Sequence, residues 1–237
     1  MTVRLITFDL DDTLWESRPV LLKAELAMLE WLAEHYPRLS QQFSPEQLRT
    51  LKNQVAQAQP HLQHRVSQLR QESLRQALNL AGYGESEAAE GAVAAFRVFH
   101  QARQQVTLFD SVIPTLADLH TRYCLGALTN GNADANQIGL MSYFDFALCA
   151  EDLGASKPAP DLFQAALRRT GCDAREAVHV GDHPLDDMEG ALACGFRTVW
   201  ANFRQQPWTA NWRPDAEIHH WRELLDVIAK FDRSQPA

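Results

Sequence analysis

Short apolar runs that alternate with segments of helical periodicity constrain the fold of this chain more than any other feature. Five runs have the length of buried strands: 3–8, 123–128, 146–149, 177–180 and 198–200. Helical patterns accompany the later runs, at about 132–141, 159–170, 185–194 and 221–231. Strand–helix alternation of this kind predicts βαβ units, and therefore an α/β fold with a parallel sheet.

A change in composition marks a second region. Eight of the eleven glycines lie at or after Gly126, whereas thirteen of the eighteen glutamines fall between Gln41 and Gln105. Glycine-poor sequence rich in Gln, Ala and Leu favours helices. We therefore expect an all-helical domain at 17–107, inserted into a core domain made of 1–16 and 108–237.

Four helices are expected in this insert, as in a small bundle. The first carries an apolar stripe with the 3–4 spacing of one helix face, which predicts that the stripe packs inward. Its members are Leu22, Leu26, Leu29 and Ala33. The second helix is predicted to begin with Ser44 as its N-cap and Pro45 at its first helical position. Apolar residues at 66–80 and around 93–96 mark the third and fourth.

Charge and the distribution of apolar residues exclude several classes of protein. Lys and Arg number 22 against 30 Asp and Glu, a net charge of −8, which argues against a general nucleic-acid binder. No run of about 18 apolar residues is present, and acidic residues follow the first strand too soon for a signal peptide. The four cysteines lie too far apart for a disulfide framework or a zinc site. A cytoplasmic protein without nucleic-acid or membrane partners is expected.

Polar clusters follow four of the five predicted strands. They are Asp-Leu-Asp-Asp-Thr at 9–13, Thr-Asn-Gly-Asn at 129–132, Ser-Lys-Pro at 156–158 and Gly-Asp-His-Pro-Leu-Asp-Asp at 181–187. Any one of them is ordinary as a loop or helix cap. Ligands of parallel sheets, however, bind outside the carboxyl ends of the strands. Four clusters in succession therefore predict one shared site at that edge.

These clusters resemble the motifs of the haloacid dehalogenase superfamily, a large family of mostly phosphate-handling hydrolases. The first motif corresponds to 9–13, the second to Thr129, the third to Lys157 and the fourth to Asp182 with Asp186 or Asp187. The resemblance covers the whole chain, because one subgroup carries a cap domain after the first motif, where the helical insert lies. It implies a doubly wound, Rossmann-like parallel sheet with an inserted four-helix cap.

A narrower resemblance rests on residues around the motifs, at 11–20, 128–133 and 178–182. These stretches are similar to a bacterial branch of phosphatases linked to riboflavin synthesis. The resemblance implies a flavin-type substrate such as FMN or 5-amino-6-(5-phosphoribitylamino)uracil.

Phosphoryl transfer explains the residue types at the predicted site. A phosphate monoester is a dianion, so a site with an anionic nucleophile must neutralise charge. Asp9 is expected to attack phosphorus, and Asp11, two residues along an extended backbone, to protonate the leaving alkoxide and then activate water. Lys157 suits a position between the nucleophile and a phosphate oxygen. Thr129 and Asn130 are candidate donors to the phosphoryl group, although a threonine that merely ends a strand is also ordinary.

A Mg2+ ion suits an all-oxygen site of this kind. Its expected ligands are the Asp9 carboxylate, the Asp11 backbone carbonyl and Asp182.

Two positions remain with two interpretations each. In the fourth motif we favour Asp187 for orienting Lys157 or a metal-bound water, and assign Asp186 to capping the helix that follows. Trp15, at the start of the insert, either packs at the hinge or stacks on a heterocyclic substrate.

The leading prediction is a Mg2+-dependent phosphomonoester hydrolase for a small phosphorylated metabolite, acting as a monomer or weak homodimer. Phosphoglycolate or sugar-phosphate hydrolysis and a phosphomutase are alternatives, since they use the same pair of carboxylates. Dehalogenation is disfavoured because a halide leaves without a proton, so that Asp11 would be unnecessary. A non-catalytic protein is disfavoured because every motif is intact.

Overall fold

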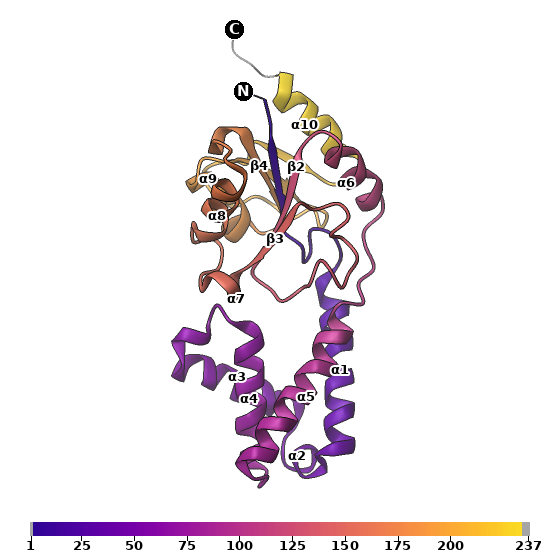
Figure 1. The fold of residues 1–237 in the computed structure, drawn as a ribbon, viewed down its shortest axis with the longest axis vertical. Coiled ribbons are helices and arrows are strands. Elements are labelled where there is room, and N and C mark those ends of the chain that lie inside the picture. The colour runs from indigo at the N-terminus through magenta and orange to yellow at the C-terminus, as the bar shows by residue number, and fades with distance from the viewer. Residues whose placement is uncertain (1, 234–237) are drawn as a thin grey trace. The chain divides into compact units, whose positions relative to one another are not determined.

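A computed structural model describes residues 2–233 and places six strands in one sheet (Figure 1). The strands are β1 (Leu5–Phe8), β2 (Cys124–Thr129), β3 (Phe146–Cys149), β4 (Ala177–Gly181), β5 (Arg197–Ala201) and β6 (Ala216–Ile218). Their order is β3-β2-β1-β4-β5-β6, and all pairs are parallel. The predicted α/β fold with a parallel sheet is confirmed, and β6 is a strand that the sequence pattern did not reveal.

Helices cover both faces of this sheet, as a doubly wound fold requires. The helical elements of the core are α6 (Val112–His120), α7 (Ala150–Leu153), α8 (Asp161–Thr170), η2 (Ala174–Glu176), the π-helical η3 (Pro184–Glu189), α9 (Gly190–Ala193) and α10 (Glu223–Arg233). Helices α8 and α9 lie on one face, and α6 and α10 on the other (Figure 1). The strands are buried between these layers, and all four residues of β1 are inaccessible to solvent.

The described residues divide into two compact units, one formed by the segments before residue 17 and after residue 106, and the other by the helical insert 17–106. The insert contains α1 (Ser17–His35), α2 (Pro37–Gln42), α3 (Pro45–Ala58), η1 (Pro60–Leu62), α4 (Val66–Leu80) and α5 (Glu85–Arg103). Its four long helices agree with the sequence pattern, whereas the short helix α2 is additional. The predicted N-cap of α3 is confirmed: Ser44 Oγ accepts from Gln47 N at 3.3 Å, and Gln47 Oε1 accepts from Ser44 N at 2.7 Å.

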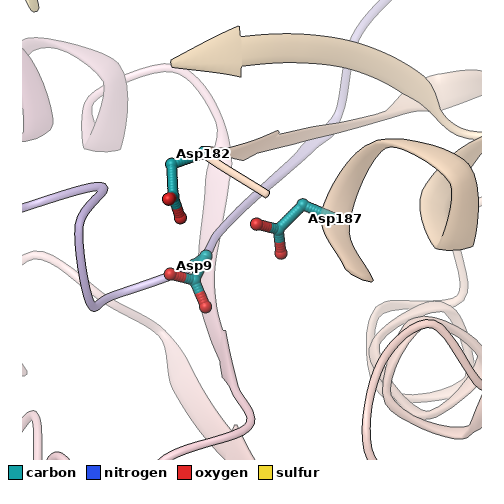
Figure 2. Close-up of side chains that lie close together, drawn as sticks. All are labelled: Asp9, Asp182 and Asp187. Carbon is teal, nitrogen blue, oxygen red and sulfur yellow. The ribbon is translucent and has the colours of Figure 1, made fainter. Parts of the chain in front are cut away.

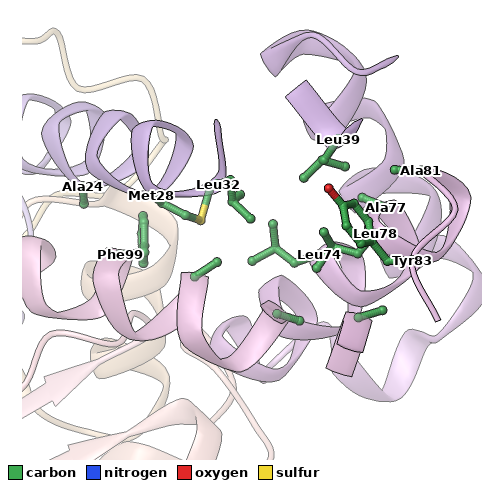
Figure 3. Packing of buried hydrophobic residues seen from close by; sticks show 13 residues of the cluster. Ala24, Met28, Leu32, Leu39, Leu74, Ala77, Leu78, Ala81, Tyr83 and Phe99 are labelled. Atoms are coloured by element: carbon green, nitrogen blue, oxygen red, sulfur yellow. The ribbon is translucent and has the colours of Figure 1, made fainter. Parts of the chain in front are cut away.

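The core of the insert is built from a different face of α1 than the one expected. Ala24, Met28 and Leu32 are buried in it (Figure 3), whereas Leu22 and Leu26 are 54% and 57% exposed. The prediction that this stripe packs inward is therefore wrong for Leu22 and Leu26, whereas Leu29 of the same stripe is partly buried against the cluster. Alanines explain the choice: Ala24 on α1 and Ala88, Ala92 and Ala95 on α5 are all buried in the same cluster, and small side chains let two helices approach closely.

The helix expected at about 132–141 is not formed. The segment 132–141 forms turns instead of a helix. Asp134 explains this, because its Oδ1 accepts from the backbone N–H groups of Asn136 (2.9 Å) and Gln137 (3.2 Å), which competes with helical hydrogen bonding.

The four cysteines are free thiols and half-buried. Within residues 2–233, no helix is both long and apolar enough to cross a membrane.

Candidate active site

Three carboxylates meet at the carboxyl end of the sheet (Figure 2). Asp9 directly follows β1, Asp182 follows β4, and Asp187 comes from η3. Each has an oxygen within 4.8 Å of an oxygen of the others. The backbone N–H of Asp9 donates to Val180 O at 2.9 Å, so the pairing of β1 with β4 continues to the first carboxylate and holds it at the edge.

Lys157 joins two of these carboxylates and is 2% exposed. Its Nζ donates to Asp9 Oδ1 at 2.8 Å, to Asp187 Oδ1 at 2.6 Å and to the backbone oxygen of Leu128 at 2.7 Å. Burial disfavours the ammonium, but the charges of Asp187 and Asp9 outweigh it and raise the pKa of Lys157. The lysine is therefore a fixed positive charge against Asp9.

Asp187 is the most enclosed of the three carboxylates. Its Oδ1 accepts from Lys157 and lies 3.1 Å from His179 Nε2, and its Oδ2 accepts from the backbone N–H of His183 at 2.9 Å. Gly181 leaves the room for it, because a Cβ there would come within 2.3 Å of Asp187 Cγ. Although burial opposes ionisation, Lys157 and His179 hold the pKa of Asp187 well below its usual range. Asp187 is thus a stable anion that orients the lysine.

Asp186 points elsewhere and does not cap the helix. The N-cap is His183, whose Nδ1 accepts from the backbone N–H of Asp186 at 3.0 Å, which corrects the assignment of that role to Asp186. Asp186 Oδ2 lies 3.5 Å from Asn130 Nδ2. Asn130 mainly clamps the lysine loop: its Oδ1 accepts from Lys157 N at 2.8 Å, and its Nδ2 donates to Lys157 O at 2.9 Å.

Thr129 ends β2 and is buried at the same edge. Its Oγ1 accepts from the backbone N–H of Gly131 at 3.0 Å. That bond uses a lone pair of the hydroxyl and leaves its hydrogen available for donation to an anion.

Asp11, two residues after Asp9, forms a pair with Trp15. Trp15 Nε1 donates to Asp11 Oδ1 at 3.0 Å. The Trp15 side chain is 0% exposed, so it has no ring face to offer a ligand, and its backbone pairs with Leu108 where the chain returns from the insert. This corrects the expectation that Trp15 stacks on a substrate and agrees with hinge packing. Burial is the main cause of the raised pKa of Asp9, and the charge of Asp11 adds to it.

The remaining carboxyls are suited to a divalent cation. Burial raises the pKa of Asp9 to about 7, despite the opposing charge of Lys157. Burial, together with the charges of Asp9 and Asp187, raises the pKa of Asp182 to about 8. A cation stabilises the ionised form of carboxyls whose ionisation is disfavoured by burial and by neighbouring anions.

A pH-dependent stability follows for the metal-free protein. Because the native carboxyls of Asp9 and Asp182 bind protons more tightly than in the unfolded chain, whose Asp pKa is 3.8, their contribution to stability is lost as the pH rises through about 7 to 8. We expect the melting temperature in EDTA to fall between pH 6 and 8.5, and Mg2+ to raise it more at the higher pH. Thermal unfolding at both pH values, with and without Mg2+, measures this. The control is Asp182→Asn, which should reduce both effects; equal effects in this variant would contradict the prediction.

A cavity of about 140 Å³ opens beside Asp182 within the core unit. Its lining includes Phe109 and Phe203, whose rings meet edge to face with centroids 5.2 Å apart, and Gln206. Asp12, with a left-handed φ of 61°, also lines this cavity and pairs with Arg204 at 2.6 Å. The loop after β5 therefore borders the site, which the sequence analysis did not predict.

Two further polar residues beneath the site were also not predicted. Thr7 and His179 lie in the otherwise apolar strands β1 and β4 and are wholly buried. A polar residue inside a buried strand is the signal that identifies such positions, because it needs a hydrogen-bond partner there.

Comparison with known proteins relates this sequence and fold to enzymes of one family. A family model described as haloacid dehalogenase-like hydrolase matches residues 3–195. The 5-amino-6-(5-phospho-D-ribitylamino)uracil phosphatase YigB of Escherichia coli (strain K12) is 34% identical over 95% of this chain and 96% of its own length. The glyceraldehyde 3-phosphate phosphatase of Methanopyrus kandleri is 30% identical over 97% of this chain and 98% of its own length. A crystal structure of a 2-haloacid dehalogenase from Pseudomonas syringae pv. Tomato DC3000 has 46% identity and a TM-score of 0.94, covering 97% of this chain and 100% of the other.

Proposed function

This chain belongs to the haloacid dehalogenase-like hydrolases, and we propose that it is a phosphatase that hydrolyses small phosphate monoesters through a phosphorylated Asp9. The observation that carries the proposal is the buried Lys157 ammonium, which bridges Asp9 and Asp187. It holds a permanent positive charge against one oxygen of an anionic nucleophile, as attack on a dianion requires.

The first half-reaction transfers the phosphoryl group to Asp9. A carboxylate oxygen of Asp9 attacks phosphorus in line, and the bond between phosphorus and the ester oxygen breaks. The proton of the Asp11 carboxyl passes to the leaving alkoxide. Lys157, 2.8 Å from Asp9 Oδ1, reduces the repulsion between nucleophile and substrate, and the Thr129 hydroxyl donates to a phosphoryl oxygen.

The second half-reaction restores the enzyme. Asp11, now ionised, takes a proton from a water molecule whose oxygen attacks the phosphorus of phosphorylated Asp9. The bond between phosphorus and the Asp9 oxygen breaks, inorganic phosphate leaves, and Asp9 is again a carboxylate. One residue therefore serves as acid and then as base.

Mg2+ is the cofactor that this oxygen donor set fits. Asp187 already accepts from Lys157 and His183 and contacts His179, so the carboxylates that remain for a cation are Asp9 and Asp182. We assign these two, with the backbone carbonyl of Asp11, as its ligands. When bound, Mg2+ supplies positive charge beside the phosphoryl oxygens.

For the substrate we infer a phosphorylated ribityl heterocycle, either 5-amino-6-(5-phosphoribitylamino)uracil or FMN. The similarity to YigB over 95% of this chain supports this inference. The cavity beside Asp182 also supports it, because its lining includes two phenylalanines, which can contact a heterocycle. The test measures phosphate release from these two compounds, a nucleoside monophosphate, phosphoglycolate and a hexose phosphate, with Mg2+ and with EDTA. It tests both the phosphatase activity and the identity of the substrate. No Mg2+-dependent release from any of them contradicts the phosphatase proposal. Release that is not best with the flavin-pathway compounds contradicts only the substrate.

Phe203→Ala is expected to affect substrates unequally. Loss of the ring removes a contact to a heterocycle but none to a small aliphatic phosphate, so KM for the ribitylaminouracil phosphate should rise about tenfold and KM for glyceraldehyde 3-phosphate should change less than about twofold. The matched control is Gln205→Ala, an exposed neighbour on the same loop. Steady-state kinetics with both substrates measure the difference, and a parallel rise in both KM values would place the ring outside the substrate site.

Dehalogenation is a second candidate, favoured by the 46% identity to the Pseudomonas syringae 2-haloacid dehalogenase structure. Two observations favour phosphate hydrolysis over it: an acid/base carboxyl at Asp11, which halide departure does not need, and a carboxylate cluster suited to a cation. Assays of halide release from 2-chloropropionate and of phosphate release, on the same preparation, separate the two.

A further inference from the structure

His179 is a buried histidine to which the mechanism above gives no role. It lies within β4, is 0% exposed, and has Thr7 of β1 as its neighbour across the sheet. Its Nδ1 lies 2.8 Å from Thr7 Oγ1, and its Nε2 lies 3.1 Å from Asp187 Oδ1. The ring of Phe163 packs against it edge to face, at 5.1 Å between centroids. Both ring nitrogens therefore have a polar partner in a site without solvent.

The partners determine which nitrogen carries the proton. An ionised Asp187 can only accept, so His179 Nε2 must be the N–H that donates to it. Burial lowers the pKa of His179, and the neutral ring then has an unprotonated Nδ1, which accepts from the Thr7 hydroxyl. The hydroxyl has another possible acceptor, Val178 O, but at the longer distance of 3.3 Å. The result is a chain of hydrogen bonds directed from Thr7 through His179 to Asp187.

This chain ends on the oxygen that holds the lysine. Asp187 Oδ1 accepts from both His179 Nε2 and Lys157 Nζ, and the same Nζ donates to Asp9 Oδ1. Asp187 Oδ2 is held separately by the backbone of His183. Among residues 2–233, Lys157 and His179 are the two side-chain donors recorded for Asp187 Oδ1, so loss of His179 leaves the lysine alone there, in an interior where an unmade hydrogen bond is costly.

We propose that His179, backed by Thr7, is a positioning residue that keeps Asp187 Oδ1 directed at Lys157 and thereby keeps the ammonium against Asp9. The proposal rests on the proposed function, in which Asp9 and Lys157 act on a phosphate ester. Because the effect reaches the nucleophile through two other side chains, it should appear in kcat more than in KM.

The test compares three variants of the full chain. His179→Leu keeps apolar bulk but removes the donor, so kcat for p-nitrophenyl phosphate should fall about 10- to 100-fold with KM within about threefold of wild type. His179→Gln retains an Nε2 donor and should recover kcat to within about tenfold of wild type. The matched control is Phe163→Leu, which disturbs the same packing without a polar contact to Asp187. It should lower the melting temperature but leave kcat within about twofold when assayed well below that temperature.

Three outcomes overturn the proposal: a folded His179→Leu with wild-type kcat, an equal loss in His179→Gln and His179→Leu, or an equal loss in Phe163→Leu. Should His179→Leu fail to fold, Thr7→Val provides the test, since it removes the donor to Nδ1 at constant shape. Its kcat should fall about 3- to 10-fold, and an unchanged kcat would overturn the proposal. A wild-type protein that releases no phosphate from any ester contradicts the proposed function instead, so the two failures are distinguishable.

Discussion

Asp9→Asn is expected to abolish phosphatase turnover while leaving the protein folded. The amide has nearly the shape of the carboxylate but no charge with which to attack phosphorus, and no phosphorylated residue can form. Lys157 keeps Asp187 as its anionic partner, so the buried ammonium remains paired. Phosphate release with Mg2+ and circular dichroism on the same preparation measure the two parts of the expectation.

Asp12→Asn is the matched control for this experiment. The same chemical change is made three residues along the chain, at a side chain that pairs with Arg204. Asparagine tolerates the left-handed φ of 61° at this position, so the backbone should be retained and turnover should stay within about tenfold of wild type. Turnover in Asp9→Asn comparable to that of Asp12→Asn would refute the mechanism.

Asp11→Asn is expected to lower turnover of alkyl phosphates by about two to four powers of ten, because the alkoxide then leaves without a proton. p-Nitrophenyl phosphate has a leaving group that needs little protonation, so its phosphorylation step should lose much less. Single-turnover measurements with both esters isolate that step. Equal losses on the two esters would show that Asp11 has some other role.

Trp15→Phe distinguishes the effect of the Asp11 proton from that of the neighbouring tryptophan. It keeps a ring in the buried position but removes the indole N–H that donates to Asp11 Oδ1. The loss of turnover should be smaller than in Asp11→Asn, since the carboxyl itself remains. A loss as large as that of Asp11→Asn would mean that the tryptophan, and not the proton of Asp11, dominates the effect.

Much of the arrangement of the site residues could be predicted from the sequence. Strand periodicity, with the rule that parallel strands end at one edge, was enough to expect that Asp9, Lys157 and Asp182 meet there, and the structure brings them together. Between Asp186 and Asp187 the sequence favoured the latter, and it is Asp187 that contacts Lys157 at 2.6 Å. Asp9 and Asp182 follow strands directly, so their place depends on local chain direction. Lys157 lies beyond α7 and Asp187 within η3, so their place at this edge also depends on the tertiary fold.

The face of α1 that packs inward could not be read from the pattern. The helix is apolar on more than one side, so the stripe with Leu22 and Leu26 and the stripe with Ala24 and Met28 show the same helical spacing. Which stripe is buried depends on how closely α5 can approach, and small residues permit the closer approach. The buried face of α1 therefore depends on packing against a helix more than fifty residues away in the chain.

The sequence by itself determined five of the six strands, the edge at which the polar residues gather and the residue types present there, because these depend on neighbours along the chain. Only the tertiary structure decided which hydrogen bond each buried polar group makes. Lys157 meets Asp9 across 148 residues, and His179 meets Thr7 across 172. The tertiary structure also decided between the two interpretations of Trp15. Its side chain is buried against residues distant in the chain, so it packs at the hinge and does not contact a ligand. A buried polar group must be satisfied by whatever the fold brings beside it, and no local pattern encodes that partner.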